Sequence, residues 1–181
     1  MPFYSYGKQV KYSVIDLSSV DEKLIEDFSC GNNEIDRIIK NKNSPESTIK
    51  LVMDDKKKCL IGFIAYQASG IRLYYENTAI TKPALQINYF AIDSRYQHLQ
   101  YDNHEDFQEN KYNLSDEIFC EFLKLFRKIS EEFLYFEYII LYSVPNAKNF
   151  YIRNFFEEFN TYMSPDKYRY LDGCLPMYMS I

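Results

Sequence analysis

The stretch Ile87–Gln97, INYFAIDSRYQ, decides the fold together with Leu141–Phe159, LYSVPNAKNFYIRNFFEEF. Each stretch begins with an apolar run of the length of a buried strand and then passes into a more polar turn. Binding and catalytic groups often lie on the turns that follow such strands. The two stretches therefore predict two inner strands, each of which leads into a turn that could build a site.

The rest of the chain predicts one sheet with helices packed against it. Apolar or alternating runs predict strands at residues 9–17, 49–53, 60–68, 84–92, 136–142 and 175–181. Apolar residues at helical spacing predict helices from Asp21 onward and over residues 33–42, 115–133 and 145–158. Residues 70–83 fit either an extra strand or a covering loop. This order of elements predicts a mixed α/β fold in a single domain over residues 1–181.

Size and charge limit the possible functions. The chain has 181 residues and a mass of 21.7 kDa, which suits one domain. Hydrophobic residues make up 46% and charged residues 26%, a composition that excludes a disordered chain. The formal net charge is −5 and the pI is about 5.1, so long-range attraction to phosphate backbones is not expected. We therefore expect nucleic acid to be an unlikely partner.

The cysteines and the N-terminus indicate a cytoplasmic protein. Four cysteines lie far apart with no C-x-x-C pair, which argues against a zinc site or a redox pair: Cys30, Cys59, Cys120 and Cys174. Free thiols in a reducing compartment are the simplest interpretation. The N-terminus lacks a basic region followed by an apolar run, and no stretch of about 18 apolar residues occurs. We expect no export and no membrane anchor.

The strand over residues 84–92 and its exit resemble the fourth strand of the GCN5-related N-acetyltransferase (GNAT) family. The resemblance implies a central, mostly antiparallel twisted sheet with helices on both faces, whose fourth and fifth strands splay apart. In that family acetyl-CoA lies between the splayed strands, and its pantetheine arm pairs with backbone groups of the fourth strand. Phe90, Ala91 and Ile92 match the residues that make these contacts, and Gln97 matches a residue of the turn that follows.

A second match supports the resemblance. Ala147–Tyr151 (AKNFY) and the later Phe156 fit a family pattern in which the tyrosine protonates the departing thiolate. The resemblance thus implies that Tyr151 is the general acid and that Ala147 and Phe150 line the cofactor. A phenol with an ordinary pKa near 10 keeps its proton at neutral pH and suits this role. The alternative is a core tyrosine, because the chain has 18 tyrosines and this one lies on the apolar face of a predicted helix.

The phosphate-binding loop departs from the family pattern. After Gln97 the family has two small residues that let backbone amides surround the diphosphate, whereas this chain continues with His98-Leu99-Gln100-Tyr101-Asp102. The next helix is expected to begin only at Ser115, a candidate N-cap. In one account Ser115, Leu114 and nearby amides still bind the phosphates, with Lys111 adding charge. In the other, cofactor binding has been lost and the fold serves recognition.

Weaker signals concern the acceptor side and metals. Residues 28–31 (FSCG), with Ile35 and Asp36, resemble a GNAT subgroup that includes toxins acting on aminoacyl-tRNA, although Asp36 also fits a helix-surface charge. His98 and His104 lie in an acidic stretch and could bind a cation, but loop histidines beside acids are usually solvated. No metal site is expected.

The resemblance implies an acetyltransferase that moves an acetyl group from acetyl-CoA directly to a primary amine. The backbone N–H near Ile92 would polarise the thioester carbonyl. A water held by Asn88, Tyr89 or Tyr66 could act as the base. The expected acceptor is a small-molecule or protein amine, and a homodimer is possible. The alternatives are a binding protein without catalysis and an aminoacyl-tRNA-acetylating toxin.

Overall fold

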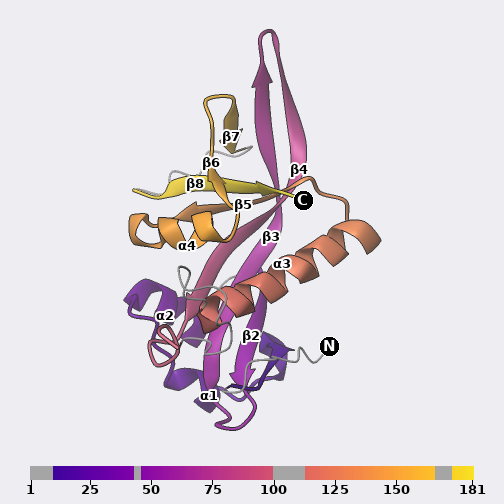
Figure 1. Cartoon of the computed structure of the whole chain (residues 1–181). Coiled ribbons are helices and arrows are strands. Elements are labelled where there is room, and N and C mark those ends of the chain that lie inside the picture. Colours follow the sequence, from indigo (N-terminus) through magenta and orange to yellow (C-terminus); the bar gives the residue numbers. More distant parts are fainter. Residues whose placement is uncertain (1–9, 43–45, 100–112, 166–172) are drawn as a thin grey trace, which may run out of the picture. The chain divides into compact units, whose positions relative to one another are not determined.

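The computed structural model describes residues 10–42, 46–99, 113–165 and 173–181 (Figure 1). The chain divides into two compact units. The first comprises Met1–Ala65 and Tyr89–Glu121, and the second comprises Tyr66–Asn88 and Phe122–Ile181. Both units are thus built from separate stretches of sequence. That residues 1–181 form a single domain stays a prediction.

Three regular elements run from one unit into the other, namely β3 (Leu60–Tyr75), β4 (Thr78–Ile92) and α3 (Leu114–Glu132). Residues 70–83, which could have been a strand or a loop, belong almost entirely to β3 and β4. The two strands are joined by a short turn at Glu76 and Asn77. The hairpin end shows no alternation because its residues are exposed on both faces, which hides a strand from periodicity arguments.

The first unit contains a strand pair whose two strands are separated in sequence by short helices. Its other elements are β1 (Tyr12–Asp16), η1 (Leu17–Ser19), α1 (Lys23–Glu26), α2 (Asn33–Lys40) and β2 (Thr48–Asp54). β1 and β2 are antiparallel, with Tyr12 opposite Asp54. The helix α2 begins after Asn32, whose Oδ1 accepts hydrogen bonds from the N–H groups of Glu34 and Ile35 at 3.0 and 3.3 Å.

A hydrophobic core holds the short helices of the first unit against its strands. The rings of Phe28 and Phe63 meet edge to face with centroids 5.7 Å apart, and both side chains are fully buried. Ile25 and Ile39 of α1 and α2 belong to the same cluster, as does Leu51 of β2. Since α1 is only four residues long, this burial rather than helix propensity stabilises it.

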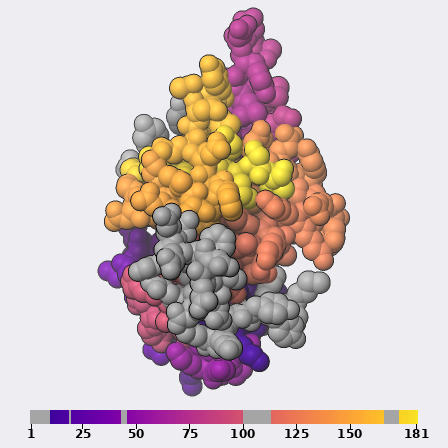
Figure 2. Space-filling model, in the orientation of Figure 1, coloured from indigo at the N-terminus to yellow at the C-terminus, as the bar shows by residue number. Residues whose placement is uncertain are grey.

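The second unit arranges its strands around β5 (Tyr138–Ser143). Its other elements are η2 (Pro145–Ala147), α4 (Lys148–Arg153), β6 (Glu157–Glu158), β7 (Met163–Pro165) and β8 (Leu175–Ser180). β5 is parallel to β4, and their pairing runs from Ala84 opposite Tyr138 to Ile87 opposite Leu141. β8 is antiparallel to β5 and to β6, whereas β7 pairs with β3. Within the second unit, no other described segment covers the tip of the β3–β4 hairpin on the face seen in Figure 2.

These pairings confirm the predicted mixed α/β fold. The strand order is β1-β2-β3-β4-β5-β8-β6, with the parallel β4–β5 pair in a sheet that otherwise includes antiparallel pairs. The β4–β5 pairing ends at Ile87 and Leu141, while β4 continues to Ile92 and β5 to Ser143. In the described part of the chain no helix is both long and apolar enough to span a membrane.

Two helix ends differ from the sequence expectation. α3 ends at Glu132, and Phe133, expected to continue its apolar face, is 79% exposed. The helix expected to run to residue 158 ends at Arg153, because Phe155 adopts a left-handed conformation with φ +69°. The chain reverses there, with the Phe156 N–H donating to the Tyr151 carbonyl at 3.0 Å.

Candidate functional site

The end of β4 is held tightly against β3 within the first unit. A Cβ atom added to Gly62 of β3 would lie 2.5 Å from the Ala91 carbonyl oxygen, so only glycine permits this approach. The Asp93 N–H donates to the Ile61 carbonyl at 2.7 Å. Ala91 and Ile92 are buried, and the ring of Phe90 lies 4.9 Å from that of Phe119 in α3. The backbone of the expected cofactor-binding residues is therefore fixed from the β3 side.

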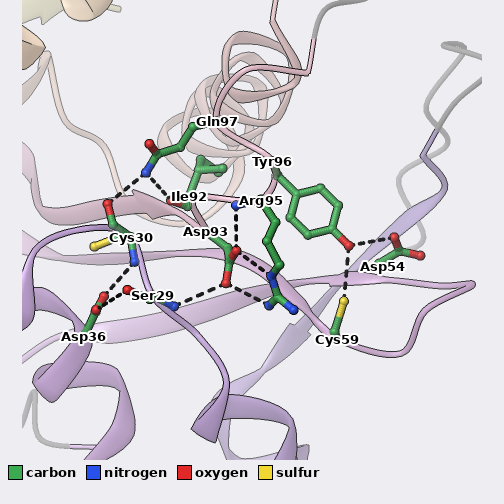
Figure 3. A network of polar contacts seen from close by, with 10 residues as sticks. All are labelled: Ser29, Cys30, Asp36, Asp54, Cys59, Ile92, Asp93, Arg95, Tyr96 and Gln97. Carbon is green, nitrogen blue, oxygen red and sulfur yellow. Dashed lines mark hydrogen bonds and ion pairs between the residues drawn. The ribbon is translucent and has the colours of Figure 1, made fainter.

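Gln97 joins the end of β4 to the loop between α1 and α2 (Figure 3). Its Nε2 donates to the Ile92 carbonyl at 2.8 Å and to the Cys30 carbonyl at 2.9 Å. An amide NH₂ has two donors, and both are engaged within the protein. The assignment of Gln97 to the cofactor site stays a prediction, and its amide nitrogen stabilises the protein backbone.

Asp93 is the centre of this polar network and is only 1% exposed. Its Oδ1 accepts from the Arg95 N–H and Nε at 2.9 and 2.7 Å, and its Oδ2 accepts from Arg95 Nη2 and the Ser29 N–H at 2.8 and 3.2 Å (Figure 3). Burial alone would raise the pKa of Asp93. The hydrogen bonds from Arg95 and Ser29 and the Arg95 charge outweigh it, so the pKa lies below its ordinary value.

Asp36 extends the network to α2. Its carboxylate accepts from the Ser29 hydroxyl at 2.9 Å and from the Cys30 N–H at 2.8 Å. Burial favours a raised pKa, but these bonds prevail and the pKa of Asp36 is lowered. Its place is therefore structural and buried, not a surface charge. Burial and the neighbouring Asp36 raise the pKa of the Cys30 thiol to about 11, which keeps it protonated and unreactive at neutral pH.

A second chain of hydrogen bonds connects the β4 exit to the turn between β2 and β3. The buried Tyr96 hydroxyl donates to Asp54 Oδ2 at 2.9 Å and lies 3.2 Å from Cys59 Sγ (Figure 3). Asp54 Oδ1 also accepts from the N–H groups of Lys56 and Lys57, both at 2.8 Å. Burial, Cys59 and Asp54 together raise the pKa of Tyr96, so this phenol stays neutral.

Sequence reasoning missed the roles of Asp54 and Asp93 because both lie where a strand ends and a polar segment begins. Asp93 is not part of a periodic pattern of apolar residues, and its partner Ser29 lies 64 positions away in the sequence. A local signal existed in Asp93-Ser94-Arg95, where an aspartate can bond to the backbone two residues ahead. Asp54 carries the same signal toward Lys56.

Tyr151 lies on α4 in the second unit and is 9% exposed. Its ring packs edge to face on Phe150 and Phe156, with centroids 5.1 and 5.9 Å apart. Burial raises its pKa above the ordinary tyrosine value, so the phenol holds its proton throughout the neutral range. Ala147 ends η2 just before α4, on the same short segment as Phe150 and Tyr151.

The N-terminus of α3 differs from the expected phosphate site. The helix begins at Leu114, and the residue before it is Asn113 rather than Ser115. Asp116 Oδ2 accepts from the Asn113 N–H at 3.1 Å, and the Leu114 N–H donates to the Leu99 carbonyl at 2.9 Å. The N–H groups of Asp116 and Glu117 both donate to the Asn113 carbonyl. Four of the five amides from Asn113 to Glu117 thus already have protein acceptors, and Ser115 is the remaining candidate.

The remaining candidates are the residues that could hold a basic water, the two histidines and the altered loop. Asn88 Oδ1 accepts from Gln86 Nε2 at 2.8 Å, and the Tyr66 ring packs against Phe126 with centroids 4.9 Å apart. His98 is exposed. Across residues 10–42, 46–99, 113–165 and 173–181 no group of three His, Cys, Asp or Glu side chains could hold a metal. His104 and its acidic neighbours, like Lys111 and most of the altered loop, lie outside the described residues.

Comparison with known proteins shows similarity only at the level of structure. No protein-family model matches the sequence, and no curated protein does. A bacterial toxin matches with a TM-score of 0.68 and 18% identity, over 100% of this chain and 92% of its own. A tyrosine-to-phenylalanine variant of the AtaT toxin, solved with the C-terminus of the antitoxin AtaR and acetyl-CoA, matches with a TM-score of 0.66. It is 9% identical over 96% of this chain and 94% of its own.

A third similar structure corrects the expectation about nucleic acid. AtaT complexed with acetyl-methionyl-tRNA matches with a TM-score of 0.63 and 10% identity, over 92% of this chain and 94% of its own. Another similar structure is the KacTA–DNA complex. The prediction that nucleic acid is an unlikely partner is therefore wrong, because proteins of this architecture occur in complexes with tRNA and DNA. The chain has the GNAT fold, as it shares the architecture of these toxin structures over nearly its whole length.

Proposed function

We propose that this protein is an N-acetyltransferase that takes its acetyl group from acetyl-CoA. The observation that carries the proposal is Tyr151, a buried tyrosine that stays protonated at neutral pH on the helix following β5. The fold supports it, because toxins of the same architecture have been solved with acetyl-CoA. The end of the β4–β5 pairing at Ile87 and Leu141 fits the splayed strands that the family resemblance implies.

The residues present fit the thioester end of the cofactor better than its phosphates. The backbone of Phe90, Ala91 and Ile92, fixed by β3, would hold the pantetheine arm, and Ala147 and Phe150 would line it. For the diphosphate, the described part of the α3 N-terminus offers chiefly the Ser115 amide. Acetyl-CoA, once bound, supplies an acetyl group activated as a thioester.

Two protein groups would then assist transfer to the amine. The Ile92 N–H would donate toward the acetyl carbonyl oxygen, as oxyanion-hole donors do. Tyr151 would hold a proton at its phenol oxygen until the departing sulfur needs it. Its raised pKa means that this proton is retained up to and beyond pH 10, so alkaline pH should not remove the acid.

The first test replaces Tyr151. Tyr151→Phe should lower the acetyl-transfer rate by about 100-fold, within the range for general acid catalysis, and leave acetyl-CoA affinity within about twofold. Calorimetric titration gives the affinity, and a free-thiol assay of released coenzyme A gives the rate. Tyr12→Phe is the matched control, because it also removes a buried hydroxyl, one that donates to Glu117 at 3.3 Å in the first unit. Equal rates in the Tyr151 and Tyr12 variants would reject Tyr151 as the acid.

A binding protein without catalysis is the second candidate, and the α3 N-terminus favours it. The amides of Asn113 and Leu114, which a phosphate site would use, donate to Asp116 and Leu99 instead. Titration with acetyl-CoA separates the two functions. The absence of any heat at millimolar acetyl-CoA would remove the transferase and leave the recognition function.

The acceptor amine is proposed to be that of an aminoacyl-tRNA. A structure of the same fold contains acetyl-methionyl-tRNA. The segment Phe28–Gly31 with Asp36, which resembles the toxin subgroup, is joined to the end of β4 by Asp93 and Gln97. Incubation with a mixture of aminoacyl-tRNAs and radioactive acetyl-CoA tests this, and label that stays out of the RNA fraction while entering small amines would contradict it.

A further inference from the structure

The turn between β2 and β3 gathers positive charge on a chain whose net charge is −5. Lys56, Lys57 and Lys58 follow one another there, and all three are exposed. Lys11, also exposed, lies beside the turn, because its carbonyl accepts from the Asp55 N–H at 2.9 Å. The overall negative charge therefore conceals a local basic surface, which we call the lysine turn (Lys56–Lys58 with Lys11).

Two carboxylates offset part of the charge of the lysine turn, namely the half-buried Asp55 and the buried Asp54, which interacts electrostatically with Lys57. Asp54 is buried and directed inward, where it accepts from the Tyr96 hydroxyl and from two backbone N–H groups of the turn. The nearby Asp93 is likewise buried and bound to Arg95, so this pair contributes little net charge. The four lysines outnumber Asp54 and Asp55, so the surface of the turn keeps an excess of positive charge.

The lysine turn is also rigid. Lys58 adopts φ +54°, a left-handed conformation that costs a residue with a side chain about 1 kcal/mol and that glycine adopts freely. Its N–H donates to the Asp54 carbonyl at 2.9 Å. Lys57 Nζ lies 5.1 Å from the centroid of the Tyr96 ring, which is buried and hydrogen-bonded. The sequence thus keeps a lysine where glycine would be more stable, in a turn fixed to the exit of β4.

We propose that the lysine turn binds the sugar-phosphate backbone of RNA. The inference rests on the proposed function with an RNA-borne acceptor and identifies the surface that would hold that RNA. Three adjacent residues place their charges within about 8 Å of chain, which suits successive phosphates of one strand better than a single anion. Lysine binds phosphate as a point charge, and the turn contains no arginine, whose planar fork matches carboxylates and phosphates alike.

The test measures RNA binding directly and does not depend on acetyl transfer. Fluorescence anisotropy of labelled, deacylated tRNA is recorded with the full chain over a range of salt concentrations. The variant Lys56→Gln/Lys57→Gln/Lys58→Gln should bind at least about 10-fold more weakly near 0.1 M salt. Its plot of log affinity against log salt should be shallower by about 2, since each phosphate contact contributes roughly 0.7 to 0.9.

A matched control removes the same charge elsewhere. Lys23→Gln/Lys124→Gln/Lys128→Gln changes three lysines of α1 and α3 and should keep tRNA affinity within about threefold. The backbone N–H groups that bind Asp54 remain in the turn variant, so its circular dichroism and melting temperature should match the wild type. Equal loss of affinity in both variants would show that only net charge matters and would overturn the proposal.

Two further arms separate other anions from RNA. If the turn variant loses affinity for acetyl-CoA and keeps its tRNA binding, the turn binds the phosphates of the coenzyme and the proposal is wrong. If polyglutamate displaces tRNA at equal charge concentration, the surface binds acidic peptides instead. Absence of tRNA binding by the wild-type chain overturns this inference alone, because acetyl-CoA titration of the same sample decides the transferase function separately.

Discussion

Phe155 shows how one residue can keep a conformation without the residue type that suits it. Its backbone has a left-handed conformation, φ +69°, which suits glycine, and its side chain is 82% exposed. The left-handed conformation ends α4 and directs Phe156 back toward Tyr151, where their rings pack. The residue type at position 155 therefore affects stability more than it affects the geometry around Tyr151.

Phe155→Gly should raise the free energy of unfolding by up to about 1 kcal/mol, because glycine adopts the left-handed conformation without steric cost. For a chain of this size the melting temperature would rise by roughly 2 to 4 °C. Phe155→Ala is the control, since it removes the exposed ring and keeps the strained backbone. Equal stabilisation by both substitutions would attribute the effect to the ring and contradict the conformational explanation.

Asp93 is the residue on which the β4 exit depends most. Asp93→Asn should lower the free energy of unfolding by about 2 kcal/mol, less than for a fully buried ion pair because the Arg95 side chain is 49% exposed. Urea unfolding measures the loss. Asp16→Asn, which breaks the exposed pair with Lys50, should cost less than about 0.5 kcal/mol.

The same substitution changes the dependence of stability on pH. The folded-state pKa of Asp93 lies below the unfolded value of about 3.9, so its stabilisation is complete above that pH and is lost as pH falls through the folded pKa. Wild-type stability should therefore decline below about pH 4, and that of the Asn variant should decline less. Parallel pH curves for the two proteins would show that Asp93 contributes no such linkage.

At the scale of elements, the contact between β3 and β4 depends on Gly62. Gly62→Ala would place a Cβ atom 2.5 Å from the Ala91 carbonyl oxygen, a backbone atom that cannot rotate away. We expect a loss of about 2 kcal/mol in the free energy of unfolding, as for other overpacked sites. Gly31→Ala, which meets no atom within 4 Å and costs only its positive φ, should lose about 1 kcal/mol. A Gly62 variant as stable as the wild type would mean that the strands can separate there.

The elements also show what the sequence could and could not predict. Phe90–Ile92 and Tyr151 lie in a strand and a helix that apolar runs predict, because burial leaves a periodic pattern. The hydrogen bond from Tyr96 to Asp54 spans 42 positions and joins two turns, so no local pattern records it. The sequence did not distinguish a strand from a loop at the hairpin end of β3 and β4, because strands exposed on both faces show no alternation of apolar and polar residues. The altered loop after Leu99 lies outside the described residues.

At the scale of the whole molecule, net charge was a poor guide to partners. Electrostatic attraction between exposed groups falls off within about 10 Å at moderate salt, so a cluster of lysines acts locally whatever the total charge. The lysine turn keeps an excess of positive charge because its lysines outnumber the nearby carboxylates, one of which, Asp54, is buried in hydrogen bonds. A prediction from composition has to ask where charges lie, and only the folded chain answers that.

The three points where the chain crosses from one unit to the other should resist proteolysis. They occur at residues 65–66, 88–89 and 121–122, inside β3, β4 and α3 respectively. Proteases cut exposed loops that can unfold locally, and the interiors of regular elements open rarely. Mass spectrometry of a limited trypsin or chymotrypsin digest should find early cuts away from these points. Early cleavage within two residues of any of them would show that the element is frayed there.

That connectivity also decides how the gene can be divided. Neither half corresponds to a contiguous reading frame, because the chain changes halves three times, each time in the middle of a strand or helix. Division of the gene at any of these three points would interrupt the hydrogen bonds of a strand or helix in both fragments. Exchange of one unit with a homologue would require exchange of two separate segments. Neither unit can therefore be produced as one continuous segment of the chain.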